Sequence, residues 1–416
     1  MSGPAQTCDV LIAGGGAVGS ALACALAELP LDVVLVEARR PNLLEQPSFD
    51  ARVTALANGS QQILAGLGLW PELESYVEPI RFIHVSERGR FGAARIAAAE
   101  ENVPALGYTV ENSTLGRVLW ERLQRAPRLT VLAPAVVTAL VREPSEVSVT
   151  VELGGAAETV RAKLVVAADG VRSAVRAALG VNAAEHDYGQ RAVVFNSSTE
   201  APLDGRAFER FTPRGPIALL PLTGGRAAAI WTLPEGDGER IAALPVDEFA
   251  AELQKAFGHR LGRFTRVGER HLYTLTRVAS EAIHGERAVL VGDAALRLHP
   301  VAAQGFNVAL RDIATLAEVI ADAVREHRDP QAPVDVGAAP LLERYAAWRA
   351  ADRRRVSSFT HGLIHLFGES APGFATGRGL GLMAFDLVPG AKALLARRTM
   401  GKAGRLPRLA RGLRLL

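Results

Sequence analysis

Residues 9–37 read DVLIAGGGAVGSALACALAELPLDVVLVE, and this stretch decides the fold. The apolar run from Asp9 to Ala13 predicts a buried strand, the glycines a tight turn, and residues 17–29 a helix that ends near Pro30. A second apolar run, from Leu31 to Val36, predicts the next strand. A strand, a helix and a second strand in this order are typical of α/β proteins that contain a parallel sheet.

The glycines of this stretch fit the pattern G-x-G-x-x-G of dinucleotide-binding turns. Gly14 permits the tight turn, Gly16 lets a pyrophosphate approach the backbone, and Gly19 lets helix and strand pack closely. Glu37 ends the second strand, where a carboxylate accepts hydrogen bonds from a ribose diol. Nicotinamide and flavin dinucleotides share the adenosine diphosphate half that this motif recognises, so the motif alone does not choose between them.

The rest of the chain predicts two further kinds of structure. β-rich runs at residues 130–141, 147–153 and 159–168, a short buried strand at 288–291 and a long helix at 308–326 extend the α/β part. Between residues 185 and 277, alternating runs separated by turn residues predict an antiparallel sheet, to which Pro79–Glu100 adds strands. We therefore expect a Rossmann-like α/β domain with an inserted antiparallel β-sheet domain and a helical C-terminal region.

The expected domains alternate along the chain. They are the dinucleotide-binding domain in three parts (1–78, 105–184 and 281–330), the sheet domain in two parts (79–104 and 185–280) and a helical region at 340–416.

Composition excludes several classes of protein. Of the 416 residues, 49% are hydrophobic and 22% are charged, which is typical of a soluble globular chain. The 47 basic and 44 acidic residues leave a net charge of +3, too balanced for a protein whose main partner is nucleic acid. Cys8 and Cys24 give neither a disulfide framework nor metal-ligand spacing, so we expect a cytoplasmic protein without a metal site. The uncharged run at residues 10–27 contains four glycines, which disfavours a membrane span.

Two segments near residue 300 can contact a cofactor. Asp293 follows the buried strand at 288–291, at the sheet edge where ligands bind in α/β proteins, although an aspartate there also suits a helix N-cap. Residues 298–307 lead into the next helix, whose unpaired N–H groups can stabilise negative charge on a bound ring. From spacing alone, this segment also fits an ordinary connection.

Several motifs together resemble the flavin-dependent aromatic hydroxylases, and within them the hydroxylases of ubiquinone biosynthesis. The superfamily motifs are GGGAVG at 14–19, FDARVTAL at 49–56, VEN at 110–112, AADGVRSAVR at 167–176 and VGDAALRLHPVAAQGFNVALRD at 291–312. The motifs of the narrower group are GRAFERFTPRGPIALLP at 205–221, LIHLFGE at 363–369 and LARRTMG at 395–401. The resemblance covers nearly the whole chain.

The resemblance implies a set of FAD-binding residues at the matching positions. They are Gly14, Gly16, Gly19, Glu37, Arg52, Asn112, Arg117, Asp169, Gly292, Asp293, Gln304, Gly305 and Asn307. His299 and Pro300 would lie on the substrate-facing side of the flavin, where His299 could move the phenolic proton because its unperturbed pKa is near neutrality. A structural or packing role for His299 is the competing interpretation.

The resemblance also implies the reaction. Reduced nicotinamide, NADH or NADPH, delivers electrons to FAD, and the reduced flavin activates O₂ as a C4a-hydroperoxide, whose terminal oxygen attacks an electron-rich phenol. The implied substrate is a polyprenylated methoxyphenol of ubiquinone biosynthesis, hydroxylated para to its hydroxyl group. Ala303 and Ala309 depart from the family pattern, since glycine is expected at both positions.

The last 26 residues, 391–416, carry eight basic residues and no acidic one. A helix from Leu406 would place Leu406, Leu409, Ala410, Leu413 and Leu416 on one face and four arginines on the other. Such a helix can lie on an anionic membrane, here the cytoplasmic face of the inner membrane, where a polyprenyl substrate resides. A solvated helix end or a protein docking surface, such as a ubiquinone-biosynthesis complex, fits the pattern equally well.

Three alternatives remain open from the sequence. The enzyme could hydroxylate another position of the ring, or it could be a two-electron dehydrogenase that binds NAD at residues 14–19. It could also be an inactive flavin-binding subunit of a biosynthetic complex, if changes such as Ala303 have removed catalysis.

Overall fold

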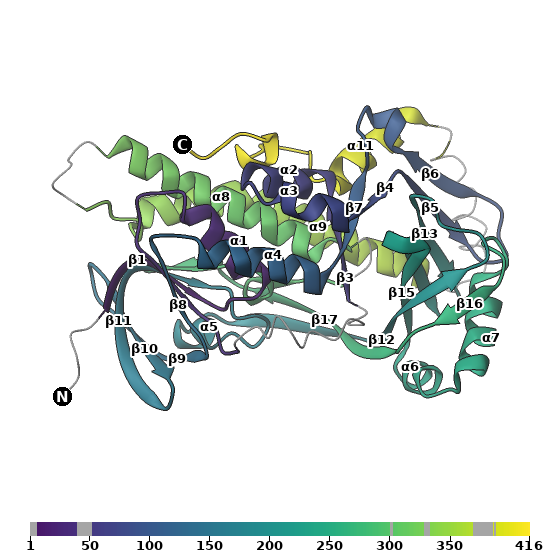
Figure 1. Ribbon diagram of the computed structural model, residues 1–416, viewed down its shortest axis with the longest axis horizontal. Helices are drawn as coiled ribbons and strands as arrows, with labels where there is room; N and C mark the ends of the chain where they lie inside the picture. The colour runs from purple at the N-terminus through teal and green to yellow at the C-terminus, as the bar shows by residue number, and fades with distance from the viewer. Residues whose placement is uncertain (1–5, 40–51, 300–302, 328–332, 369–385, 387) are drawn as a thin grey trace.

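The computed structural model describes residues 6–39, 52–299, 303–327, 333–368, 386 and 388–416. Three sheets and a set of helices divide the molecule into a parallel-sheet half and a half built on the second sheet (Figure 1). The helices are α1 (Ala17–Leu26), α2 (Asn58–Gly66), α3 (Trp70–Leu73), α4 (Asn112–Gln124), α5 (Ala174–Ala178), α6 (Glu235–Ala242), α7 (Val246–Phe257), α8 (Gly305–Glu326), α9 (Ala339–Gly368) and α11 (Pro389–Thr399).

The first sheet contains the strand, helix and strand unit at the N-terminus. Its strands are β1 (Gln6–Ala13), β2 (Val33–Val36), β8 (Leu129–Leu132), β9 (Ala135–Arg142), β10 (Val147–Leu153), β11 (Ala156–Ala167), β18 (His284–Gly285) and β19 (Ala288–Leu290). The central order β19-β11-β1-β2-β8 is parallel, and β10 forms antiparallel pairs with β11 and β9. The hairpin expected across Gly154-Gly155 is confirmed, because Leu153 pairs with Ala156.

Both faces of the first sheet are covered. One face packs Val10, Ile12 and Leu35 against α1, α4 and α8 in the largest apolar core. The other face packs alternate residues, among them Leu11 and Val34, against β9, β10 and α5. Strands buried on both faces are expected to be continuously apolar, which is why the runs at 10–13 and 33–36 contain no polar residue.

One strand prediction in this half was wrong. The run at 130–141 is two strands, β8 and β9, separated around Pro134. β8 pairs with β2 whereas β9 pairs with β10, so the chain changes partners at the proline, which has no N–H group to donate to a sheet.

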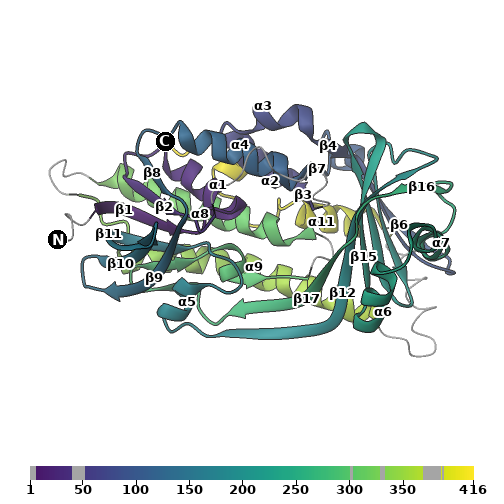
Figure 2. The ribbon, with the colours of Figure 1, turned by 60° about the horizontal axis from the view of Figure 1, so that its bottom comes forward.

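The second sheet forms the other half. Its strands are β5 (Phe82–Glu87), β6 (Ala93–Ala97), β12 (Ala183–Thr199), β13 (Arg206–Thr212), β14 (Gly215–Leu222), β15 (Arg226–Pro234), β16 (Phe264–Val267), β17 (His271–Ser280) and β20 (Leu296–Arg297). The pairing is antiparallel, as expected, except that β5 runs parallel to β13. The long strands β12 and β17 extend from this sheet toward the first half (Figure 2).

A third, small sheet connects the halves. It contains β3 (Val53–Ala57), β4 (Glu78–Ile80) and β7 (Gly107–Glu111), with β7 between the other two. The Thr109 hydroxyl of β7 donates to the Pro221 carbonyl of β14, and Glu111 pairs with Arg226 at 2.8 Å. This sheet therefore fixes the second sheet against the N-terminal half.

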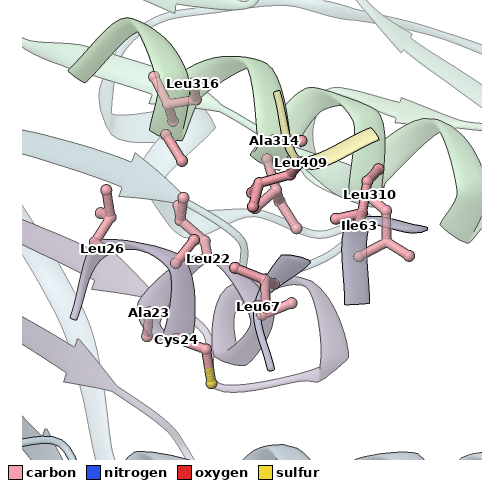
Figure 3. Packing of buried hydrophobic residues seen from close by; sticks show 14 of the residues in the cluster. Leu22, Ala23, Cys24, Leu26, Ile63, Leu67, Leu310, Ala314, Leu316 and Leu409 are labelled. Atoms are coloured by element: carbon pink, nitrogen blue, oxygen red, sulfur yellow. The ribbon is translucent and has the colours of Figure 1, made fainter. Parts of the chain in front are cut away.

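The C-terminal tail does not form the helix expected from Leu406. Residues Leu409–Arg411 form a single 3-10 turn that Gly412 ends at a φ of 72°. Leu409 and Leu415 are buried, and Leu409 packs among Leu22 of α1, Ile63 of α2 and Leu310 of α8 (Figure 3). The amphipathic pattern therefore divides: Leu409 and Ala410 fill the largest core, whereas Leu413 and Leu416 are exposed.

The arginines of the tail also differ from the expected polar face. The guanidinium of Arg405 stacks on the ring of Trp348 at 3.7 Å, and Arg408 pairs with Asp322 at 2.8 Å. Arg411 and Arg414 are exposed.

Candidate active site

A cleft of about 460 Å³ lies at the carboxyl ends of β1 and β2, where the glycine motif begins α1. Gly14 has a φ of +102°, and a Cβ on it would lie 2.5 Å from the Ala168 carbonyl oxygen. A Cβ on Gly19 would lie 1.8 Å from the Gly14 carbonyl oxygen. Both positions therefore require glycine for the fold itself.

Gly16 differs from the other two motif glycines. A Cβ placed on Gly16 meets no atom within 4 Å, and its φ of −63° is ordinary for any residue. Gly16 lines the cleft at the N-cap of α1, and no side chain caps this helix end. Because the fold does not require glycine there, the missing side chain leaves the space that a phosphate needs at a helix N-terminus.

Glu37 closes the cleft at the end of β2. Its Oε2 accepts a hydrogen bond of 2.6 Å from the Gly15 N–H, and its Oε1 accepts one of 2.9 Å from the Arg39 N–H. These bonds fix the carboxylate over the glycine turn. Each oxygen keeps a second lone pair, which a ribose hydroxyl can use.

The opposite wall of the cleft contains the Asp169-Gly170 motif. Asp169 Oδ2 accepts a hydrogen bond of 3.2 Å from the Val175 N–H, at the first turn of α5. Asp169 Oδ1 is buried without a hydrogen-bond partner in the described part of the chain. Burying a carboxylate oxygen without a hydrogen-bond partner costs free energy. Asp169 Oδ1 is therefore suited to accept a hydrogen bond from a bound ligand.

Asp293 follows Gly292, which packs against helix α1. Gly292, with a φ of +59°, packs so closely on α1 that a Cβ would lie 3.0 Å from the Val18 side chain. The turn Gly292–Ala294 then presents the Asp293 carboxylate to an open region, while surrounding protein raises its pKa by desolvation. Asp293 is not an N-cap, because it lies within the turn and Val291 holds the capping position.

The start of α8 is fixed to β3 through Asn307. Asn307 Oδ1 accepts from the Ala57 N–H at 2.8 Å and the Ser60 hydroxyl at 2.7 Å, and its Nδ2 donates to the carbonyls of Ala55 and Ala303. The Asn307 amide is thereby saturated by protein groups, so its contribution is to position the helix N-terminus.

The neighbours of Asn307 differ in what they offer a ligand. A Cβ on Gly305 meets no atom within 4 Å, so the helix N-terminus is accessible there. The buried Gln304 side chain is directed toward α11, where its Nε2 lies 3.5 Å from the Thr399 carbonyl oxygen.

The departures from the family pattern have different consequences. Ala303 has a φ of +48°, a left-handed conformation that favours glycine, so this alanine is strained. Ala309 lies inside α8 and is buried, where alanine causes no strain.

Arg52 and Asn112 meet where β3 pairs with β7. The Asn112 N–H donates to the Arg52 carbonyl at 3.2 Å, and the Asn112 Oδ1 accepts from the Thr54 hydroxyl at 2.7 Å. Arg117, further along α4, makes its contacts with Glu121 and Tyr76. Its guanidinium pairs with Glu121 at 3.1 Å and lies 5.4 Å from the ring centre of Tyr76.

His299 has the environment of a packing residue. It is 2% exposed, its Nε2 lies 3.2 Å from Gln190 Oε1, and its ring meets Tyr188 edge-on at 5.0 Å. Burial lowers its pKa to about 4, so the imidazole is neutral at neutral pH and is too weak a base to hold a phenolic proton. The proton-moving role of His299 stays a prediction, and Pro300 lies outside the described residues.

The second sheet presents two unlike faces to its surroundings. On the outer face, residues such as Phe195, Leu219 and Trp231 are buried against α6 and α7. The alternate residues form the inner face, defined by Val85, Val194, Glu209, Ala218, Leu220 and Ile230, all half-buried.

Side-chain contacts join β12 to the segment before α8, and β17 to α9. Gln190 of β12 contacts His299, and Arg277 of β17 donates to the Ser357 hydroxyl of α9 at 3.2 Å. At the other end, Ile83 packs on the cluster that includes Met400. Sequence reasoning selected no residue of this face. One feature of the sequence could have indicated this face: the acid Glu209 lies in strand β13 between the buried residues Phe208 and Phe211.

No metal site or membrane-spanning helix is found in the described ranges. No group of three or more His, Cys, Asp or Glu side chains there could hold a metal ion. Likewise, no helix among those residues is both long and apolar enough to cross a membrane. Burial raises the pKa of both Cys8 and Cys24 to about 12, so neither thiol is reactive at neutral pH.

The residues around the cleft fit FAD. The open space over Gly16 and Gly305 and the buried oxygen of Asp169 are features that the protein's own packing does not explain. The fold and the cleft define an FAD-dependent monooxygenase. Sequence comparison agrees, since the profile of the family described as FAD binding domain matches residues 7–356.

Two relatives of this chain are hydroxylases of ubiquinone or of a ubiquinol. The chain is 41% identical over 413 residues to ubiquinone hydroxylase UbiL of Rhodospirillum rubrum, a match that covers 99% of this chain and 94% of that protein. It is 32% identical over 385 residues to 3-demethoxyubiquinol 3-hydroxylase of Escherichia coli, covering 92% and 95%. The chain therefore belongs to the FAD-binding monooxygenase family that includes the ubiquinone hydroxylases, and FAD is its cofactor.

Solved structures agree on the fold. p-Nitrophenol 4-monooxygenase PnpA from Pseudomonas putida superposes with a TM-score of 0.78 at 18% identity, covering 96% of this chain and 100% of that one. PqsL of Pseudomonas aeruginosa, in complex with 2-aminobenzoylacetate, gives a TM-score of 0.75 at 20% identity, covering 91% and 100%. The expected fold class is confirmed, whereas the residue boundaries of the expected domains stay a prediction.

Proposed function

We propose that this protein hydroxylates a polyprenylated methoxyphenol of ubiquinone biosynthesis at the ring carbon para to its hydroxyl group. The observation that carries the proposal is the 41% identity across 99% of the chain to a ubiquinone hydroxylase. The largely apolar inner face supports it, because a prenylated ring needs an apolar surface opposite the cofactor.

FAD is assigned to the cleft by residues with distinct tasks. Gly14, Gly16 and Gly19 shape the pyrophosphate site, Glu37 takes the adenosine ribose, and Asp169 and Asp293 take the centre of the cofactor. Arg52, Asn112, Gly292, Gln304, Gly305 and Asn307 complete the set by contact or by positioning. Arg117 is the weakest member, since Glu121 and Tyr76 already engage its guanidinium.

Bound FAD supplies the electron transfer that activates O₂. In the overall reaction NADH or NADPH gives two electrons, one oxygen atom enters the ring and the other leaves as water. The protein's task is to hold the ring on the inner face with its para carbon toward the start of α8, and to exclude water there.

The ring position separates the main alternatives. The name of the Escherichia coli relative specifies a 3-hydroxylase of demethoxyubiquinol, which is a different position and a different substrate. We would load the full chain with FAD, add NADH or NADPH, O₂ and either 2-prenyl-6-methoxyphenol or a demethoxyubiquinol analogue, and locate the new oxygen by mass spectrometry and NMR.

Each outcome of this experiment selects one alternative. Oxygen para to the phenol hydroxyl supports the proposal. Product from the demethoxyubiquinol analogue alone assigns the other position. Bound FAD with hydrogen peroxide as the sole product from both substrates contradicts the proposal and favours the inactive flavin subunit, for which the strained Ala303 is the motivating observation.

Peripheral contact with an anionic membrane is a second part of the proposal. Arg411 and Arg414 are exposed beside the exposed Leu413 and Leu416, so the tail can offer a small basic and apolar patch without a helix. We expect R411E/R414E to reduce co-sedimentation with vesicles that contain phosphatidylglycerol and to leave FAD content unchanged. Equal sedimentation of variant and wild type would assign the patch to solvent or to a protein partner.

A further inference from the structure

A row of side chains crosses the middle of the inner face. Successive strands align Val85 of β5, Glu209 of β13, Ala218 of β14, Ile230 of β15 and Val194 of β12. Paired residues in a sheet point to the same side, so these five side chains lie next to one another. Glu209 is the one polar member of the row.

The Glu209 carboxyl has no protein partner. Among the described residues it makes no hydrogen bond or ion pair, and burial alone raises its pKa to about 7. A half-buried carboxyl group in apolar surroundings loses part of its hydration, which is costly unless a partner compensates it. Groups of this kind occur preferentially at functional sites.

The nearby basic side chains do not compensate Glu209, and burial lowers the pKa of His84 to about 4, so its ring is neutral. His84 and Arg210 occupy alternate positions and so point to the outer face, where the His84 ring lies 5.7 Å from Phe208 and Arg210 donates to the Ser86 hydroxyl at 3.4 Å. Glu209 therefore lacks the ion pair that a structural role in the sheet would provide.

The residues next to Glu209 have small side chains. Ala218 is directly beside it on β14, and Ala207 is the next inner-face residue on its own strand. Ile230, Val194 and Leu220 continue the apolar surface away from the carboxyl, and all three are half-buried. This surface combines a site for one polar hydroxyl with an apolar wall along which a prenyl chain can lie.

We propose that Glu209 is a catalytic residue that binds the phenol hydroxyl of the substrate and accepts its proton. In this step the phenol O–H bond breaks, its electron pair stays on the phenol oxygen, and the proton forms an O–H bond on the Glu209 carboxylate. The electron-rich phenolate is more nucleophilic at its para carbon, so it takes up the incoming oxygen atom faster. The assignment rests on the proposed function, because it requires a phenol substrate.

The test compares Glu209→Gln with wild type, both as full chains loaded with FAD. The amide keeps the size of the side chain and removes the proton acceptor. Glu200→Gln is the matched control, because Glu200 also belongs to this sheet region but pairs with Arg263 at an exposed site. We would measure FAD content, melting temperature, phenol binding by the change in flavin absorbance, and the rate of hydroxylation.

With 2-prenyl-6-methoxyphenol, we expect Glu209→Gln to keep its FAD and to lose hydroxylation rate by about 100-fold or more, the usual effect of removing a general base. A ring-fluorinated analogue ionises more readily without a base, so its rate should fall at least about tenfold less. Glu200→Gln should match wild type with both phenols.

Two results would overturn the assignment. One is a Glu209→Gln rate close to that of wild type, and the other is an equal loss with both phenols, which would indicate a structural role. If wild type hydroxylates neither phenol, the proposed function fails, and binding decides the assignment separately. Weaker binding of the phenol to Glu209→Gln then supports it, and equal binding contradicts it.

Discussion

The FAD cleft and the inner face of the second sheet form their binding surfaces in different ways. The cleft depends on backbone shape, since glycines at fixed spacing and one helix N-terminus make room for a phosphate. The inner face depends on side chains that reach one surface from five strands, spread along the chain from Val85 to Ile230. The first arrangement is visible as a local motif, whereas the second exists only after the strands have paired.

The largest expected effect tests whether the cleft is set by backbone shape. Gly19→Ala places a Cβ 1.8 Å from the Gly14 carbonyl oxygen, so helix α1 must move away from the glycine turn. We expect the free energy of unfolding to fall by more than about 3 kcal/mol, with loss of bound FAD. Urea unfolding monitored by circular dichroism measures this.

Gly116→Ala is the control for Gly19→Ala. Gly116 is also helical, but a Cβ there meets no atom within 4 Å, so alanine should stabilise α4 by up to about 1 kcal/mol. Similar stabilities of the two variants would refute a steric requirement at Gly19.

The next effect contrasts the two faces of the second sheet. Ala229→Leu adds volume to the buried outer face under α7 and should destabilise the protein by about 1–3 kcal/mol. Ala218→Leu adds the same volume to the half-buried inner face beside Glu209. It should leave stability within about 0.5 kcal/mol and raise the KM for the prenylated phenol.

Denaturant unfolding and steady-state kinetics of the two leucine variants separate these effects. If Ala218→Leu lost stability without a change in KM, the inner face would be a packing surface and would not hold substrate.

A smaller effect is expected inside the cleft itself. Gly16→Ala meets no protein atom, so the fold should tolerate it, but its methyl group enters the space assigned to the pyrophosphate. We expect FAD affinity to fall about tenfold, which is about 1.4 kcal/mol, with unchanged stability of the FAD-free protein. Gly236→Ala, equally unobstructed but on α6, is the control in fluorescence titrations with FAD. Unchanged affinity of Gly16→Ala would place the phosphates elsewhere.

The smallest effect concerns Ala303. Glycine relieves its left-handed conformation, worth about 1–2 kcal/mol, but adds about 0.4–1 kcal/mol of conformational entropy to the unfolded chain. Ala303→Gly should therefore raise the free energy of unfolding by between zero and about 1.6 kcal/mol in urea titrations. A loss of stability would show that the alanine side chain makes contacts that offset its strain.

The difference between the two regions also explains what the sequence could predict. The strand, helix and strand unit, the hairpin at Gly154-Gly155 and a dinucleotide site followed from local spacing. The choice of FAD over a nicotinamide dinucleotide came from the resemblance to the flavin-dependent aromatic hydroxylases. Glu209 was missed because its isolation depends on Val85 and Ala218, which lie 124 positions before it and 9 after it. For His299 the sequence offers only the unperturbed pKa, whereas its burial in the fold lowers that pKa.

The helix predicted from Leu406 does not form, and two residues of the tail explain why. Pro407 and Gly412 bracket the turn at 409–411 and oppose a continuous helix. Of the predicted apolar face, Leu409 and Ala410 are buried and Leu413 and Leu416 are exposed. A periodic pattern does not say whether its partner is a membrane or the protein's own core.

The burial of Leu409 and Leu415 beside α1 has a consequence for biosynthesis. The core that contains Val10 and Leu22 is completed by Leu409 and Leu415, which are translated long after α1. Until then, the apolar surface of α1 and α8 lacks part of its cover, and such surfaces attract other nascent chains or chaperones. The N-terminal half is translated first, but its folding ends only when residues 409–415 have been made.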